Sequence, residues 1–167
     1  MIPVLKRDLF DVTPKVAAIC ITTNGSIRRD GAAVMGRGVA RRAARLWPSV
    51  PSQLGLLLRA HGNMVHYLGV VGLCGTLRHW NFGPRLFSFP VKYEWRQKAD
   101  INLITESMRQ LVSTLEQTGM LNLDRATAHE IWLPKPGCGN GQLSWPEVER
   151  AIEPYMHPDI KIVDLYA

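Results

Sequence analysis

Two glycine-rich segments of this chain have the composition of anion-binding loops. In the first, an apolar strand near residues 128–134 runs into a loop that contains Gly137, Gly139 and Gly141, and a helix follows. Glycine lets a ligand approach the backbone closely, so successive N–H groups can converge on an anion, and the N-terminus of a helix adds positive potential. The segment therefore predicts a phosphate-binding loop. A glycine-rich turn is the alternative when the segment is considered alone.

The second segment lies nearer the start of the chain. An apolar strand at residues 16–22 leads into Thr23-Asn24-Gly25, and the loop continues to residues 34–40 ahead of another helix. Two loops that follow neighbouring parallel strands lie at the same edge of a sheet, so one ligand can contact both. Neither loop matches the P-loop pattern or a complete dinucleotide-binding pattern. Close packing of the helix is the alternative reason for Gly36 and Gly38.

The elements that must position these loops alternate between strand and helix, which favours a mostly parallel sheet covered on both faces. The clearest helix has apolar residues at 3-4 spacing, Asp100 as its N-cap and Gly119 as its stop. Ser144 and Glu147 have the spacing of a capping box at the start of the last helix. Strands are expected near residues 2–7, 16–22, 64–71, 85–91, 128–134 and 159–166, and helices near 33–46, 51–60, 100–118 and 145–156.

The composition indicates one domain that spans residues 1–167, because this length is common for single domains and an apolar content of 46% supports a sizeable core. The chain contains no apolar run of membrane-spanning length, and its first residues do not form the apolar core of a signal peptide. Three widely spaced cysteines, Cys20, Cys74 and Cys138, fit a reducing cytoplasm better than a disulfide framework. We therefore expect a cytoplasmic monomer that does not contact a membrane.

The net charge of +6 and the pI near 9.5 favour anionic partners. Arg37, Arg41 and Arg45 recur every four residues and are expected to share one face of the helix at 33–46, opposite an apolar stripe that includes Ala43 and Leu46. This face is typical of nucleic-acid binding, and a solvated helix face is the alternative. Further positive charge is concentrated at Lys92, Arg96 and Lys98.

The motifs of this chain, taken in order, resemble those of a macrodomain. The resemblance is carried by residues 8–10, 22–25, 34–40, 89–92 and 133–145, and it extends over essentially the whole chain. It is closest to the branch that contains terminal ADP-ribose protein glycohydrolase and DarG, the antitoxin that removes ADP-ribose from DNA. The resemblance implies a three-layer α/β/α sandwich with a mixed, mostly parallel six-stranded sheet. It also implies a cleft for ADP-ribose at the loop edge.

The resemblance also implies roles for single residues. Asp8 matches the acidic residue that accepts a hydrogen bond from the adenine amino group, as an acceptor-only carboxylate can; a turn cap is the alternative. Asn24 matches the asparagine beside the distal ribose, and an Asn-Gly turn is the alternative. The implied ligand-binding residues are Asp8, Leu9, Thr23, Asn24, Gly31, Val34, Met35, Gly36, Gly38, Val39, Pro136, Gly137, Cys138, Gly139, Asn140 and Gly141.

Lys92 ends an apolar strand and matches the lysine on which the glycohydrolase branch relies. A partly desolvated lysine can lose its proton near neutral pH and attack C1″ of the distal ribose or its ring-opened aldehyde; if it stays charged, it can stabilise the leaving group. A lysine that reaches solvent from the strand end is the alternative. Terminal ADP-ribose protein glycohydrolase has a catalytic aspartate where this chain has Gly141, which places the chain nearer the DarG pattern. The implied catalytic residues are Lys92 and Asn24.

The resemblance implies that the chain binds ADP-ribose and hydrolyses an ADP-ribosyl linkage. A linkage to a nucleic-acid base is the favoured substrate. A non-catalytic reader of ADP-ribose, a phosphatase for ADP-ribose 1″-phosphate, and a structural partner with a vestigial pocket are the alternatives. The expected partners are ADP-ribose or an ADP-ribosylated macromolecule, with nucleic acid held by Arg37, Arg41, Arg45 and Arg96. No cofactor or metal is expected, because the five histidines have no carboxylate or cysteine partners at metal-binding spacing.

Overall fold

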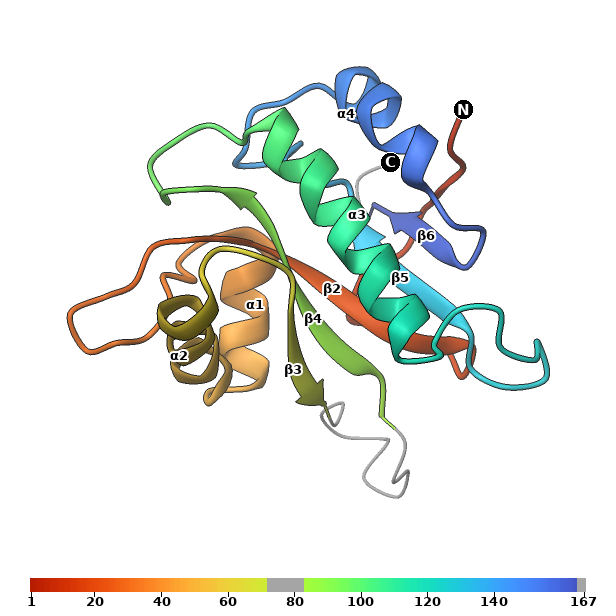
Figure 1. The fold of residues 1–167 in the computed structure, drawn as a ribbon, viewed down its shortest axis with the longest axis horizontal. Helices are drawn as coiled ribbons and strands as arrows, with labels where there is room; N and C mark the ends of the chain where they lie inside the picture. Colours follow the sequence, from red (N-terminus) through yellow and green to blue (C-terminus); the bar gives the residue numbers. More distant parts are fainter. Residues whose placement is uncertain (72–82, 165–167) are drawn as a thin grey trace.

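The computed structural model describes residues 1–71 and 83–164, which form a six-stranded sheet with helices on both faces (Figure 1). The strand order is β1-β6-β5-β2-β4-β3. All neighbouring strands are parallel except β3 and β4, which run antiparallel. Helices α1 and α2 cover one face of the sheet, while α3 and α4 cover the other. The predicted α/β class, with its mixed and mostly parallel sheet, is confirmed.

The predicted strands and helices are all present, with shorter bounds at several ends. The first strand, expected at residues 2–7, is reduced to two residues. The strands are β1 Val4–Leu5, β2 Val16–Asn24, β3 His66–Val70, β4 Arg85–Lys92, β5 Glu130–Pro134 and β6 Ile160–Val163, and the helices are α1 Gly38–Leu46, α2 Val50–His61, α3 Ile101–Gln117 and α4 Trp145–Ile152, followed by the short 3-10 helix η1 Glu153–Tyr155.

Helix α1 begins five residues later than predicted, because the segment before it is held in extended form. The Ala33 N–H donates to the carbonyl of Pro51 at 2.8 Å, and the Val34 N–H donates to the carbonyl of Ser26 at 3.0 Å. Arg37 is the extended N-cap residue, with φ −142° and ψ 158°, so it does not share a helix face with the later arginines as predicted. The predicted apolar stripe is also wrong at its end, since Leu46 is 36% exposed.

The core consists of two apolar layers, one on each face of the sheet. On the α3 side, Phe87 and Phe89 of β4 pack with Ile104 and Met108, and on the α1 and α2 side Ile19 and Ile21 of β2 pack with Leu54. The neighbouring interior strands β2 and β4 are therefore buried on both faces. Their carboxyl ends reach the same edge of the sheet, because the two strands are parallel.

Two helix starts differ in how well local sequence predicted them. The Asp100 carboxylate accepts the Leu103 N–H at 2.9 Å, which confirms the predicted N-cap of α3, and Gly119 follows the helix with φ +68°. Ser144 is the N-cap residue of α4, but its side chain makes no capping hydrogen bond. The predicted capping box with Glu147 is therefore not formed. Pro146 in the first turn favours a helix start at this point without the capping bond.

Among the residues that the structure describes, no helix is long and apolar enough to cross a membrane. Cys74 and most of the turn predicted between residues 72 and 84 lie outside the described residues.

Gly55 of α2 lies against the loop that carries Gly31. A Cβ built on Gly55 would be 2.9 Å from the carbonyl carbon of Gly31 and 3.0 Å from Cα of Ala32. Alanine raises helix propensity by roughly 1 kcal/mol over glycine, but here we expect Gly55→Ala to lower the free energy of unfolding by about 1 to 3 kcal/mol because the backbones are forced apart. Urea unfolding measures this change. The exposed Ser52→Ala in the same helix is the control, and a Gly55→Ala variant as stable as the parent would contradict this packing.

Candidate functional site

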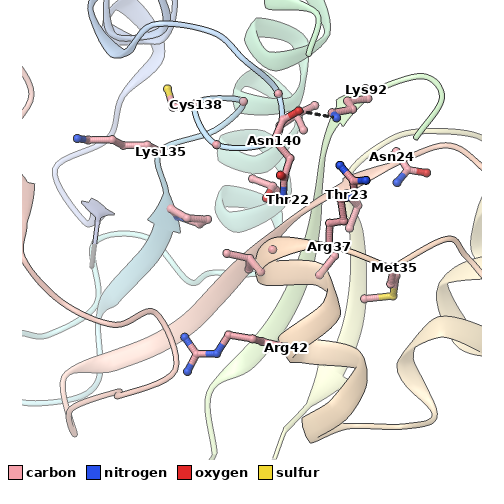
Figure 2. Close-up of a pocket in the computed structure, with 18 of the residues that line it drawn as sticks. Thr22, Thr23, Asn24, Met35, Arg37, Arg42, Lys92, Lys135, Cys138 and Asn140 are labelled. Atoms are coloured by element: carbon pink, nitrogen blue, oxygen red, sulfur yellow. Dashed lines mark hydrogen bonds between the residues drawn. The ribbon is translucent and has the colours of Figure 1, made fainter. Parts of the chain in front are cut away.

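A cavity of about 850 Å³ opens at the sheet edge where β2, β4 and β5 end (Figure 2). Its walls are the two glycine-rich loops, which the sequence predicted to meet, together with the start of α1. In chain order, the first loop is residues 25–37, between β2 and α1, and the second loop is residues 135–144, between β5 and α4. Its size and mixed polar and apolar lining are typical of a small-molecule site. Of the predicted ligand residues, the cavity is lined by Asp8, Leu9, Thr23, Asn24, Val34, Met35, Gly36, Gly38, Val39, Gly137, Cys138, Gly139, Asn140 and Gly141, and also by Lys92.

Two of the predicted ligand residues lie outside this lining. Gly31, with φ +86°, packs on α2 next to Arg59 and Gly55, because the loop folds back onto that helix. Pro136 is buried beneath the second loop, where its carbonyl accepts a hydrogen bond from the Cys138 thiol. Among the predicted arginines, Arg37 and Arg96 line the cavity, while Arg41 and Arg45 are exposed on α1 outside it.

Several residues that line the cavity from both loops have backbone N–H groups without a backbone acceptor. Within the described residues, the N–H groups of residues 36–40 donate no backbone hydrogen bond, and neither do those of residues 139–141. Arg37 supplies no side-chain cap to α1, and the first turn contains no acidic residue. N–H groups without a backbone acceptor and the positive end of α1 are chemically suited to stabilise an anion such as a diphosphate. The sequence assigned this role to the start of α4, whose residues do not line the cavity.

The second loop is closed tightly against the start of α3. The Ala99 N–H donates to the Gly141 carbonyl at 3.0 Å, and a Cβ built on Gly141 would be 2.7 Å from both the Ala99 Cβ and the Gly137 Cα. Gly137 has φ +74°, whereas a Cβ on Gly139 would meet nothing within 4 Å. The loop thus has room for a side chain at position 139 but not at position 141.

Lys92 reaches into the cavity from the end of β4. Its Nζ donates to the Asn140 carbonyl at 2.9 Å, as Figure 2 shows. Partial burial lowers the pKa of the Lys92 ammonium, and the positive charge of Arg37 lowers this pKa further. At a given pH, a larger fraction of Lys92 is therefore in the neutral amine form than of an ordinary surface lysine.

Asn140 joins the two loops across the cavity. Its carbonyl holds Lys92, and its side-chain Nδ2 would lie 3.1 Å from a Cβ built on Gly38 at the start of α1. Gly38 has φ +56°, so glycine is favoured here both by the backbone conformation and by the approach of Asn140.

Asn24 lies opposite Lys92 in the β2–β4 ladder. Its Oδ1 accepts the Ser26 N–H at 2.9 Å, and its Nδ2 donates to the Val34 carbonyl at 3.0 Å. These bonds fix the first loop, which is the turn role that the sequence left as an alternative. One amide hydrogen and one oxygen lone pair of Asn24 stay available to a ligand.

Asp8 lies at another part of the cavity, beside Arg42. Its Oδ1 accepts the Phe10 N–H at 3.0 Å and Arg42 Nη1 at 2.9 Å, while Oδ2 accepts Arg42 Nη2 at 2.8 Å. Partial burial acts to raise the pKa of Asp8, but the hydrogen bonds from Arg42 and Phe10 outweigh it and leave this pKa below its ordinary value. Oδ2 keeps one lone pair for a further donor. Both predicted roles, turn cap and ligand acceptor, are therefore compatible with the geometry.

Several cavity residues were missed by sequence reasoning. Arg42 lies over the Phe10 ring at 4.7 Å, and Lys135 forms an ion pair with Asp164 at 2.7 Å. No spacing in the sequence pairs these residues. The general excess of arginine near the first loop was the only signal for Arg42. Among the described residues, no group of three or more histidine, cysteine, aspartate or glutamate side chains could hold a metal ion.

Comparison with solved structures identifies the fold. The chain resembles the macrodomain of Mycobacterium tuberculosis DarG with a TM-score of 0.72 and 20% identity over 98% of this chain and 95% of that one. It resembles Thermosipho africanus DarTG in complex with ADP-ribose with a TM-score of 0.70 and 21% identity over 93% of this chain and 39% of that one. The chain therefore has the macrodomain fold.

Comparison of sequences agrees with this. The chain is 27% identical over 132 residues to a DNA ADP-ribosyl glycohydrolase of Thermus aquaticus. The match covers 72% of this chain but only 30% of that protein, so the chain spans less than a third of its relative's length. No protein-family profile matches the chain. Among macrodomains, the similarity is thus to DarG, and the resemblance predicted from the motifs is confirmed.

The contrast between Gly139 and Gly141 provides a test of the loop. We expect Gly141→Ala to lower the free energy of unfolding by about 1 to 3 kcal/mol, because its Cβ collides with Gly137 and Ala99. Gly139→Ala faces open space and is expected to change this free energy by less than about 0.5 kcal/mol. Chemical denaturation of both variants makes the comparison. Equal stabilities of the two variants would show that the loop is looser than described.

Proposed function

We propose that this chain binds ADP-ribose in the cavity and hydrolyses an ADP-ribosyl linkage to a nucleic-acid base. The observation that carries the proposal is the placement of Lys92 and Asn24 opposite each other beside two loops with free N–H groups. Two comparisons support it: the structurally similar DarTG is in complex with ADP-ribose, and the relative from Thermus aquaticus is a DNA ADP-ribosyl glycohydrolase. All the residues concerned belong to one chain, so a monomer suffices.

In this proposal, each part of ADP-ribose occupies a different region of the cavity. Figure 2 places Lys92 and Asn24 toward one end and Arg42 toward the other, with the start of α1 between them. The adenine then lies beside Asp8 and Arg42, with its amino group donating to the remaining lone pair of Asp8 Oδ2. The diphosphate lies between the loops, where N–H groups and the α1 dipole offset its charge. The distal ribose lies at Lys92 and Asn24.

In this arrangement Lys92 acts on C1″ of the distal ribose. As the neutral amine, it donates its electron pair to form a bond to C1″ while the bond from C1″ to the base breaks. The base leaves with the electrons of the broken bond and takes up a proton, and the amine bound to C1″ loses one. Water then releases ADP-ribose and restores the amine. Asn24 orients the ribose hydroxyl groups through its free amide hydrogen and lone pair.

The environment of Gly141 favours a nucleic-acid linkage. The catalytic aspartate of the branch that acts on protein would need a side chain at this position, where Ala99 and Gly137 leave no room. Positive charge near the mouth also favours nucleic acid, since Arg37 and Arg96 line the cavity and Arg96 stacks on the half-exposed Trp95 at 4.7 Å. Exposed indole and guanidinium groups stack readily on unpaired bases. We propose that Arg41 and Arg45 extend this contact along the exposed face of α1.

The adenine assignment predicts a loss of affinity in Asp8→Ala. Loss of the charged acceptor is expected to weaken ADP-ribose binding by about 1.5 to 3 kcal/mol, as measured by calorimetry. Asp30→Ala is the matched control, because Asp30 pairs with Arg28 at an exposed site outside the cavity and carries the same charge. An Asp8→Ala variant that binds as tightly as the control would show that adenine lies elsewhere.

The lysine assignment predicts that Lys92→Ala abolishes turnover while ADP-ribose affinity stays within about tenfold, since the amine is needed mainly in the transition state. Lys92→Arg is expected to fail as well, because guanidinium does not deprotonate. In the parent, the lowered pKa of Lys92 means that the rate rises with pH and levels off below the ordinary lysine pKa of 10.5.

The assay offers ADP-ribosylated DNA, ADP-ribosylated protein and ADP-ribose 1″-phosphate to the parent and to both variants. Turnover of the DNA substrate alone is the expected result. An active Lys92→Arg variant would indicate that the lysine acts as a charge. A parent that binds ADP-ribose but cleaves none of the three would favour a reader.

A further inference from the structure

Asn63 does not line the cavity, but its side chain contacts the backbone of Lys92. It lies in the turn between α2 and β3, just after Gly62, whose φ of +86° ends the helix. The Asn63 Nδ2 donates to the Lys92 carbonyl at 2.9 Å. Asn63 thus holds the residue whose side chain enters the cavity, without lining the cavity itself.

The same side chain contacts the residue that follows Asn24. A Cβ built on Gly25 would be 2.9 Å from the Asn63 Cγ and 2.8 Å from the Tyr93 carbonyl oxygen. The Gly25 N–H also donates to this Tyr93 carbonyl at 3.1 Å. Glycine is therefore required at position 25 by the close approach of Asn63 and of the chain after Lys92. One asparagine packs against both strand ends that carry the proposed catalytic groups.

These strand ends are irregular. The ladder pairs Thr23 with Pro90 and then Asn24 with Lys92, so Val91 is an extra residue on β4. A bulge of this kind changes the direction of the side chains that follow it. The Val91 carbonyl is bonded to the Asp100 N–H at 2.9 Å, and the Lys92 carbonyl is bonded to Asn63. Asn63 therefore supplies the hydrogen bond that holds the backbone just after the bulge.

The side-chain amide of Asn63 uses only part of its hydrogen-bonding capacity within the described residues. Its Oδ1 is buried and, among the buried side-chain nitrogen and oxygen atoms of the described residues, is the one without a hydrogen-bond partner. An unpaired buried acceptor is destabilising, and an apolar side chain of the same size would avoid it. The amide compensates by providing the donor to the Lys92 carbonyl, which an apolar side chain lacks.

We infer that Asn63 is a positioning residue, which fixes the bulged end of β4 so that the Lys92 amine and the Asn24 amide face the same point in the cavity. The inference rests on the role proposed for Lys92. Asn63 touches no reacting atom, and it acts through the carbonyl of Lys92 and the backbone of Gly25.

The test compares Asn63→Leu and Asn63→Ala with Gln110→Ala. Leucine has nearly the size of asparagine and removes both the donor and the unpaired acceptor, while alanine removes the donor without adding apolar bulk. The Gln110 Oε1 accepts the Val65 N–H at 3.0 Å in the same turn region, and Gln110 does not line the cavity. Gln110→Ala therefore loosens this turn without releasing Lys92.

We expect kcat for the ADP-ribosylated substrate to fall by about 10-fold to 100-fold in both Asn63 variants, since small misplacement of a catalytic group has effects of this size. KM and the Kd for ADP-ribose are expected to stay within about threefold. Asn63→Leu is expected to unfold at a Tm no lower than that of the parent. Losses of kcat no greater than in Gln110→Ala, or equal losses of affinity and kcat, would overturn the inference.

A second measurement separates this inference from the proposed function. The ¹³Cε signal of Lys92 is followed by NMR during a pH titration of the parent and of all three variants. A changed signal and a shifted titration in the Asn63 variants, but not in Gln110→Ala, support the positioning role even if the parent cleaves no substrate. An unchanged Lys92 signal in the Asn63 variants overturns it whatever the activity, whereas an inactive parent alone contradicts only the proposed function.

Discussion

The register between β2 and β4 is the constraint on which the site depends. These parallel strands are neighbouring interior strands of the sheet, and pairs such as Cys20 with Phe87 and Thr22 with Phe89 lie in the ladder below the cavity. Because both faces of the strands are buried, a slip of one residue would move core side chains to the opposite face, so packing fixes the register. The same register brings Asn24 opposite Lys92 at the edge of the sheet. Core packing thus determines where the polar groups of the site meet.

The anion-binding character of the cavity arises mainly from backbone geometry. Helix α1 begins without a side-chain cap, and within the described residues the N–H groups of residues 139–141 in the second loop donate no backbone hydrogen bond. These features place partial positive charges at fixed positions, which cost little reorganisation when an anion binds. Four of the neighbouring charged side chains form ion pairs, Asp8 with Arg42 and Lys135 with Asp164. Lys92 Nζ donates to a neutral carbonyl, and no carboxylate of the described residues forms an ion pair with it, so its ionisation is open to change.

Sequence reasoning succeeded where the signal was local. Helix α3 was predicted with its N-cap Asp100 and its stop at Gly119, because apolar periodicity and capping are properties of adjacent residues. The alternation of strands and helices gave the correct sheet, and most of the predicted ligand residues line one cavity. The start of α1 was predicted too early. The N–H groups of residues 33 and 34 donate to the carbonyls of Pro51 and Ser26, which lie outside the predicted helix. Gly31 and Pro136 were predicted by their place in the motifs, but they pack against the helix and loop beneath the cavity.

The sequence by itself determined the class of fold and the two glycine-rich loops, since strand, loop and helix signals are written within short stretches of the chain. It also located Lys92 at a strand end and identified the resemblance to macrodomains. Only the tertiary structure decided which groups meet. Arg42 pairs with Asp8 from 34 residues away, and Asn63 bonds the carbonyl of Lys92 from 29 residues away. Such contacts depend on the packing of helices against a sheet of fixed register, and no periodicity within the sequence encodes them.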